Sequence, residues 1–67
     1  MLSARNQIKG TVKSVKLGEV MAEVVIKMGN TEIVALISRG SAVKMKLKAG
    51  DAVTAIIKST EVMVEKA

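Results

Sequence analysis

Apolar and polar positions alternate along the first part of the chain. Between residues 6 and 17, apolar residues and a glycine alternate with lysine and threonine, which is typical of a strand with one face in water. The alternation slips after Ser14, because Val15 and Leu17 fall on the opposite parity. We interpret this slip as a β-bulge or a sharp bend, a feature with which small barrels turn a corner.

The same period of two predicts the next two strands. A turn at residues 18–19 leads into a strand over residues 20–28, and the Gly-Asn pair at residues 29–30 signals a hairpin to a strand over residues 31–38. This third strand is apolar on both faces, so we expect both faces to be covered. A chain of this length is too small to cover the strand with its own layers, which favours a second subunit as the other cover.

The remaining residues predict a short helix and two strands. The helix lies within residues 39–48, and Ser38 or Ser41 is placed to cap it. Strands are expected over residues 52–58 and 61–64. Five short strands, one helix and one bulge fit an all-β, Greek-key barrel of the OB type. Nothing in the sequence indicates a second domain, so residues 1–67 are taken as a single domain.

Composition favours an oligomer. A chain of 67 residues buries only about 60% of the surface that its unfolded state exposes, so it needs a further source of stability. There is no cysteine for a disulfide and no histidine, the commonest ligand of zinc, copper and nickel. The hydrophobic fraction is 49% without one aromatic residue, so Val, Ile, Leu, Ala and Met must build the core. We therefore expect a core shared between subunits.

The net charge and the lack of aromatic residues indicate what kind of partner the chain binds. With 11 Lys and Arg against 6 Asp and Glu, the net charge is +5, which favours an anionic partner. Single-strand nucleic-acid binding on small barrels depends on aromatic stacking, and this chain has no aromatic side chain. No apolar run approaches the roughly 20 residues of a membrane span, and no signal peptide is evident. We expect a soluble, cytoplasmic protein without a membrane or nucleic-acid partner.

Two short blocks carry the candidate chemistry. Residues 3–7, Ser-Ala-Arg-Asn-Gln, and residues 58–63, Lys-Ser-Thr-Glu-Val-Met, supply hydroxyls, a guanidinium and an ammonium. A tetrahedral oxyanion only accepts hydrogen bonds, so hydroxyls, amide N–H groups and fixed cations suit it. A simpler interpretation remains open, in which the first block is a solvated arm, the second is a polar turn, and Ser38 and Ser41 only cap the helix.

Four blocks together indicate a family. Residues 3–10 (SARNQIKG), 22–25 (AEVV), 37–41 (Ile-Ser with a second serine three residues on) and 57–63 (IKSTEVM) occur in this order. Over essentially its whole length the chain resembles the molbindins, the stand-alone Mop-type proteins that bind molybdate or tungstate. The resemblance implies an OB-like subunit that assembles as a homohexamer, a trimer of dimers, with oxyanions at subunit interfaces. The chain departs from the family pattern over residues 39–46, which are more basic than is usual.

The resemblance also implies two kinds of site. The first would combine residues from both ends of one chain with two serines of a neighbouring subunit: Ser3, the Ala4 backbone, Arg5, Lys58 and Ser59, with Ser38 and Ser41. The second lies near a three-fold axis, and its candidates are Gln7, Lys9 and the backbone around Val20. The bound metal would be the centre of an oxyanion, with no metal ligated directly by side chains.

The function expected from this resemblance is binding and buffering or storage of molybdate or tungstate, as part of molybdenum homeostasis. No organic cofactor is expected. The alternative is an OB-type nucleic-acid-binding module that uses the positive charge. An enzyme is disfavoured, because the chain lacks His and Cys and no pair of carboxylates is spaced for acid–base catalysis, so no catalytic residue is assigned.

Overall fold

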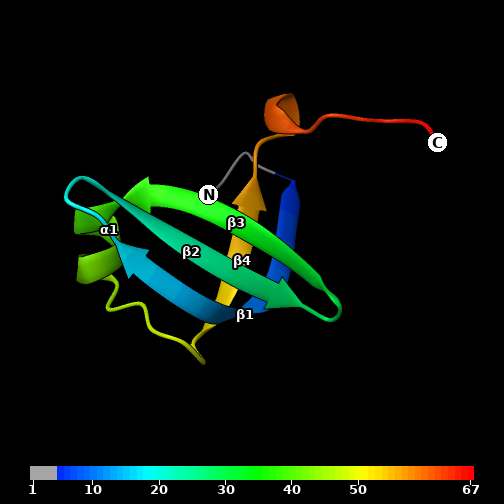
Figure 1. The fold of residues 1–67 in the computed structure, drawn as a ribbon. Coiled ribbons are helices and arrows are strands. Elements are labelled where there is room, and N and C mark those ends of the chain that lie inside the picture. Colours follow the sequence, from blue (N-terminus) through cyan, green and yellow to red (C-terminus); the bar gives the residue numbers. More distant parts are fainter. Residues whose placement is uncertain (1–4) are drawn as a thin grey trace.

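The computed structural model describes residues 5–67, which form a curled antiparallel sheet with one short helix at one end (Figure 1). The strand order in the sheet is β3-β2-β1-β4. The elements are β1 (Asn6–Leu17), β2 (Met21–Met28), β3 (Thr31–Ser38), α1 (Arg39–Lys44), β4 (Ala52–Ile57) and the single-turn helix η1 (Ser59–Glu61).

The sheet is organised by β1, which pairs with a different strand at each end. Its first half is antiparallel to β4, from the pair Asn6 and Ile57 onward. Its second half is antiparallel to β2, and here the register shifts between Val12 and Ser14, so that Lys13 is an extra residue. The predicted bulge is therefore confirmed. It bends β1 and lets one strand serve two neighbours that lie on different sides of the fold.

The hairpin between β2 and β3 is also confirmed. Met28 pairs with Thr31 at its end, and Gly29 has a φ of 59°, in the left-handed region that a two-residue hairpin turn requires. The hairpin sets β3 against β2 along its whole length, from Met28 and Thr31 to Met21 and Ser38. The helix start at Ser38 is thereby placed at the far end of the hairpin.

The core is small and aliphatic. Its central cluster consists of Val12, Val24, Ile26 and Ala55. Large apolar residues remain in water elsewhere, and Val34 and Leu36 on the outer face of β3 are 59% and 67% exposed. The third strand was expected to be covered on both faces, but its outer face is uncovered within residues 5–67, so cover by a second subunit stays a prediction.

Several predicted boundaries and one predicted strand need correction. In the structure, residues 61–64 form no strand, because η1 turns the chain away from the sheet after β4. The sheet within residues 5–67 is therefore open and four-stranded where a five-stranded barrel was expected, with β3 and β4 at its edges. β2 begins at Met21 and β4 ends at Ile57, so Val20 and Lys58 lie outside the strands.

Gly10 provides a test of the strand arrangement. A Cβ at this position would lie 2.8 Å from the Lys27 carbonyl oxygen and 2.8 Å from side-chain carbons of Ile26 and Met28. Gly10→Ala should therefore lower the free energy of unfolding by about 1–3 kcal/mol, since an overpacked core has to shift backbone as well as side chains. Urea unfolding followed by far-UV circular dichroism measures the change.

Gly40→Ala is the matched control, because its added Cβ meets nothing within 4 Å outside its chain neighbours and the backbone of α1. Alanine also has the higher helix propensity, so this variant should be neutral or slightly stabilising. Equal destabilisation by both substitutions would contradict the close approach of β1 and β2 at Gly10.

Candidate functional site

Ser38 and Ser41 lie together at the start of α1. The Ser38 hydroxyl donates to Ser41 Oγ at 2.8 Å, and the Ser41 backbone N–H donates to Ser38 Oγ at 3.1 Å. Ser38 has extended backbone angles and is the N-cap residue, which decides between the two predicted caps. Both hydroxyls are exposed, and each already has a partner in the other.

Arg39 anchors this serine pair to the rest of the fold. Its backbone N–H donates to the Val20 carbonyl oxygen at 2.8 Å, and its Nη1 donates to the Gly18 carbonyl oxygen at 2.9 Å. The turn between β1 and β2 is thereby tied to the start of α1. Sequence reasoning missed this role, because a single arginine in a basic segment carries no signal of the carbonyl groups that it will reach.

Arg5 and Lys58 lie directly beyond the terminal residue pair of β1 and β4, at the other end of β1. Because Asn6 pairs with Ile57, continuation of the antiparallel register sets Arg5 opposite Lys58. Lys58 has extended backbone angles before η1, and Ser59 is the first residue of that turn. The structure therefore brings Arg5, Lys58 and Ser59 into one neighbourhood. Ser3 and Ala4 lie outside the described residues.

These two groups of residues stand at opposite ends of the molecule (Figure 1). The 12 residues of β1 lie between them, and a strand advances by about 3.3 Å per residue. Arg5 precedes the start of β1, whereas Ser38 and Ser41 follow the strand pair that meets the end of β1 at Leu17 and Ala22. One chain cannot close both groups around one small anion.

The candidates for a second site are divided in the same way. Gln7 and Lys9 are two residues apart on β1 and are exposed on the same face. Val20 lies in the turn at the far end of β1, where its carbonyl oxygen accepts from Arg39. The structure therefore brings Gln7 and Lys9 together but does not bring Val20 to them within one chain.

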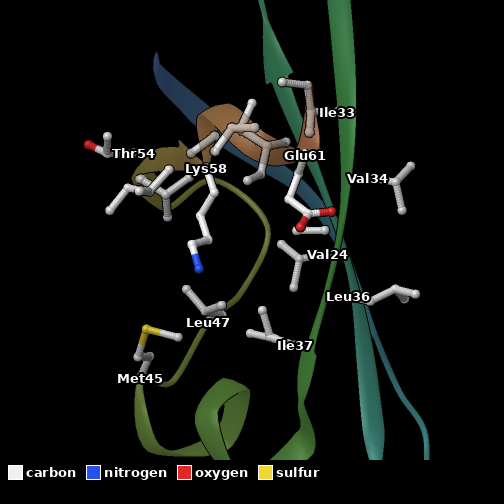
Figure 2. Close-up of a pocket in the computed structure, with 16 residues that line it drawn as sticks. Val24, Ile33, Val34, Leu36, Ile37, Met45, Leu47, Thr54, Lys58 and Glu61 are labelled. Carbon is white, nitrogen blue, oxygen red and sulfur yellow. The ribbon is translucent and has the colours of Figure 1, made fainter. Parts of the chain in front are cut away.

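A long apolar groove runs between the two edge strands, with a volume of about 470 Å³. We call it the β3–β4 groove; its walls are residues 33–37 of β3, residues 53–57 of β4, and Met45 and Leu47 from the connection between α1 and β4. Figure 2 shows Ile37 on the β3 side facing Leu47 across the open space.

Two charged residues line the end of the β3–β4 groove next to η1. Lys58 extends its amine into the groove in Figure 2, and Glu61 places its carboxylate on the β3 side. Both residues are exposed. The four-carbon stem of lysine is flexible, so the same ammonium can reach the groove or the end of β4 beside Arg5.

The ion pair found among residues 5–67 joins Lys13 Nζ and Glu32 Oε2 at 2.7 Å, and neither residue is a candidate ligand. In the same part of the chain, no three His, Cys, Asp or Glu side chains gather as a cation site would require.

No helix in the described range is long and apolar enough to cross a membrane.

The family model, the related sequences and the solved structures that match this chain agree with one another, and most of them cover nearly its whole length. Residues 2–64 match the TOBE domain family. Molybdenum-pterin-binding protein 3 of Clostridium pasteurianum is 47% identical over 64 residues, which are 94% of each chain. Among solved structures, a molybdate-binding protein from Sporomusa ovata has a TM-score of 0.94 at 42% identity and 98% coverage of both chains. The cytoplasmic molybdate-binding protein ModG, with molybdate bound, has a TM-score of 0.83 at 42% identity, over 87% of this chain and 42% of ModG.

The serine pair at the start of α1 can be tested without any ligand. Ser38→Ala removes the acceptor for the Ser41 N–H and should lower the free energy of unfolding by about 1 kcal/mol, the usual effect of losing an N-cap. Ser38→Asn keeps a side-chain acceptor and should retain most of the stability. Urea unfolding of the two variants at equal protein concentration measures the difference, and equal stability of Ser38→Ala and the unchanged protein would argue against the cap.

Proposed function

The chain belongs to the TOBE domain family, and from this premise we propose that it binds molybdate or tungstate reversibly, as a buffer or store of the oxyanion in molybdenum homeostasis. Its relatives are named as molybdenum-pterin-binding and molybdate-binding proteins. The proposal rests on two groups of hydrogen-bond donors, one at each end of β1. The first group lies around Arg5 and Lys58, and the second is Ser38 with Ser41. No chemical step is required of the protein, so it is assigned a binding role and is not an enzyme.

The first site is built from two copies of the chain. One copy supplies Ser3, the Ala4 backbone, Arg5, Lys58 and Ser59, and the second copy supplies Ser38 and Ser41. This division is supported by the separation of the two groups along β1, because donors that one chain holds apart are joined when the end of one copy meets the start of α1 of another.

The donor set of this site matches a tetrahedral dianion. Arg5 offers a planar fork of N–H donors and Lys58 a compact positive charge, so two cations balance the two negative charges. Hydroxyl groups can donate to the remaining oxygens. An incoming anion takes the hydrogen bond that Ser38 gives to Ser41, and the Ser41 N–H keeps its bond to Ser38 Oγ.

A second site belongs to the same proposal. Gln7 and Lys9 share the exposed face of β1, and a three-fold axis would turn one such pair into three. The backbone N–H of Val20 would then come from another copy, because Val20 lies at the far end of β1.

We propose a homohexamer, a trimer of dimers, as the assembly. Six hydrophobic residues are buried among those described, and none of them is larger than isoleucine: Val12, Ala22, Val24, Ile26, Ala42 and Ala55. Twelve large hydrophobic residues within residues 5–67 are exposed, and extensive exposed apolar surface favours contact with another molecule. Contact between copies would bury these residues and supply the stability that one small core lacks.

The protein is proposed to act in the cytoplasm without an organic cofactor. ModG, which is 42% identical, is a cytoplasmic molybdate-binding protein. Discrimination against sulfate would come from a rigid cavity sized for the longer metal–oxygen bonds, because the charge and shape of the anions are otherwise alike.

Calorimetric titration of molybdate tests the two cations. A hydrogen bond to a charged group contributes about 1.5–3 kcal/mol, and partial exposure to solvent places these at the lower end. Arg5→Ala and Lys58→Ala should therefore each raise the Kd for molybdate by about tenfold. Lys27→Ala removes an exposed lysine of β2 that is no candidate ligand and should leave the Kd unchanged. An equal change in all three variants would mean that net charge alone attracts the anion.

Sites between copies should also couple ligand binding to assembly. A ligand at about 100 times its Kd stabilises the state that binds it by about 2.7 kcal/mol. Saturating molybdate should therefore raise the thermal midpoint of the assembled protein, and Ser38→Asp, which keeps a capping acceptor but places a negative charge at the anion, should abolish the rise. A thermal midpoint that does not change with molybdate, or that sulfate raises equally, would count against selective sites between copies.

A further inference from the structure

The positive charge of the chain is concentrated in one stretch. Between Glu32 and Asp51 there are four basic residues and no acidic one, so this stretch supplies +4 of the net charge of +5. One of the four, Arg39, donates to a carbonyl oxygen in the turn between β1 and β2. The other three lie at the end of α1 and in its connection to β4. We call them the lysine cluster: Lys44, Lys46 and Lys48.

The lysine cluster directs its charge into water. All three residues are exposed, and none of them lines the β3–β4 groove. The ion pair found within the described range joins Lys13 to Glu32 and includes no member of the cluster. One carboxylate, that of Asp51, follows the cluster in the chain and accepts from the Lys48 backbone N–H at 3.0 Å. Three positive charges therefore stand against one negative charge at this end of the molecule.

Lys46 has a backbone conformation that favours glycine. Its φ is 54°, and the surrounding hydrogen bonds form a Schellman motif, in which the Lys46 N–H donates to the Val43 carbonyl oxygen and the Leu47 N–H donates to that of Ala42. Glycine adopts this conformation without steric cost, whereas lysine is strained there. A cation at a helix C-terminus offsets part of the strain, but Lys44 already supplies one in the last turn. The strain points to a role for the charge of Lys46 itself.

The lysine cluster lies close to the serine pair of the proposed first site. Lys44 follows Ser41 by three residues on α1, so their Cβ atoms are about 5–6 Å apart on one side of the helix. The whole of α1 has six residues, which corresponds to a length of about 9 Å. The Debye length is about 10 Å at 0.1 M salt. An anion that approaches Ser38 and Ser41 is therefore within the electrostatic reach of the cluster.

We infer that the lysine cluster attracts the oxyanion and speeds its association with the serine pair, without being among its ligands. The inference rests on the proposed function and its first site. Each lysine attracts a dianion through both of its negative charges, and such attraction raises the rate of encounter. Because the attraction acts through water and forms no direct bond, the rate of release changes little. Molybdate and sulfate carry the same charge, so the cluster favours uptake of either and adds no selectivity.

The experiment separates association from release in the full chain. Calorimetry gives the Kd for molybdate, and stopped-flow mixing of the loaded protein with excess catechol, which forms a coloured complex with free molybdate, gives koff. The association rate is koff divided by Kd. Lys44→Gln with Lys48→Gln should lower the association rate about five- to tenfold at about 0.01 M salt and leave koff unchanged. At about 1 M salt, where the Debye length is about 3 Å, the difference should disappear.

Lys13→Gln with Lys27→Gln is the matched control. It removes the same charge from β1 and β2, and Lys27 lies near the hairpin end of β2, opposite to the end that meets Ser38. The exposed ion pair that Lys13 loses contributes little to stability. This control should change the association rate by less than about twofold. Light scattering at one protein concentration should give the same mass for the control, the cluster variant and the unchanged protein.

Lys46→Gly tests the strained position. It removes one charge and relieves the left-handed backbone, so the urea midpoint should rise or stay unchanged. The association rate at low salt should nevertheless fall by about two- to threefold. A lower urea midpoint with an unchanged association rate would assign Lys46 a structural role and contradict the inference.

Three further results would overturn the inference: equal slowing by the cluster and control variants, an unchanged association rate in the cluster variant, or a faster release that persists at high salt. The first would mean that net charge alone attracts the anion, and the last would make the lysines direct ligands. Failure of the proposed function gives a different result, since the unchanged protein would then produce no heat with molybdate and hold no molybdenum by elemental analysis.

Discussion

The architecture depends on one bent strand that serves two partners. β1 gives its first half to β4 and its second half to β2, and the extra residue Lys13 bends the strand close to where the partner changes. Gly10 allows the close approach of β2 at this point, where any side chain would meet the Lys27 carbonyl. Because β1 occupies the middle of the sheet, β3 and β4 become the edges. The positions of the candidate ligands among the described residues, and of the β3–β4 groove, follow from this arrangement.

In the proposed first site, the distance between the ends of β1 means that two copies have to bind the anion together. A single copy holds two partial sets of donors, one around Arg5 and Lys58 and one at Ser38 and Ser41. Neither set surrounds an anion alone. The small aliphatic core and the exposed apolar residues favour association for a separate reason, because they leave one chain marginally stable. The stability of the fold and the proposed anion site therefore both favour contact between copies of the chain.

Local features were predictable from the sequence, and features that depend on a partner were not. The parity change after Ser14 predicted the bulge, and Gly29 predicted the hairpin, because both are set by neighbouring residues. The strand over residues 61–64 was predicted wrongly for the described chain, since alternation of side chains says nothing about whether a sheet edge lies within reach. The grouping of Arg5 with Lys58 came from family resemblance, and the register of β1 and β4 gives it a geometric reason. The carbonyl contacts of Arg39 had no sequence signal.

The mutual hydrogen bond of Ser38 and Ser41 has a consequence for the empty state of the protein. Polar groups awaiting a ligand are usually kept wet or strained, and either condition favours rearrangement when the ligand leaves. In the proposed site the two serines hydrogen-bond to one another when no anion is bound, so release of the anion leaves both with a partner. An oxyanion carrier of the proposed kind would bind and release its ligand repeatedly without refolding the start of α1.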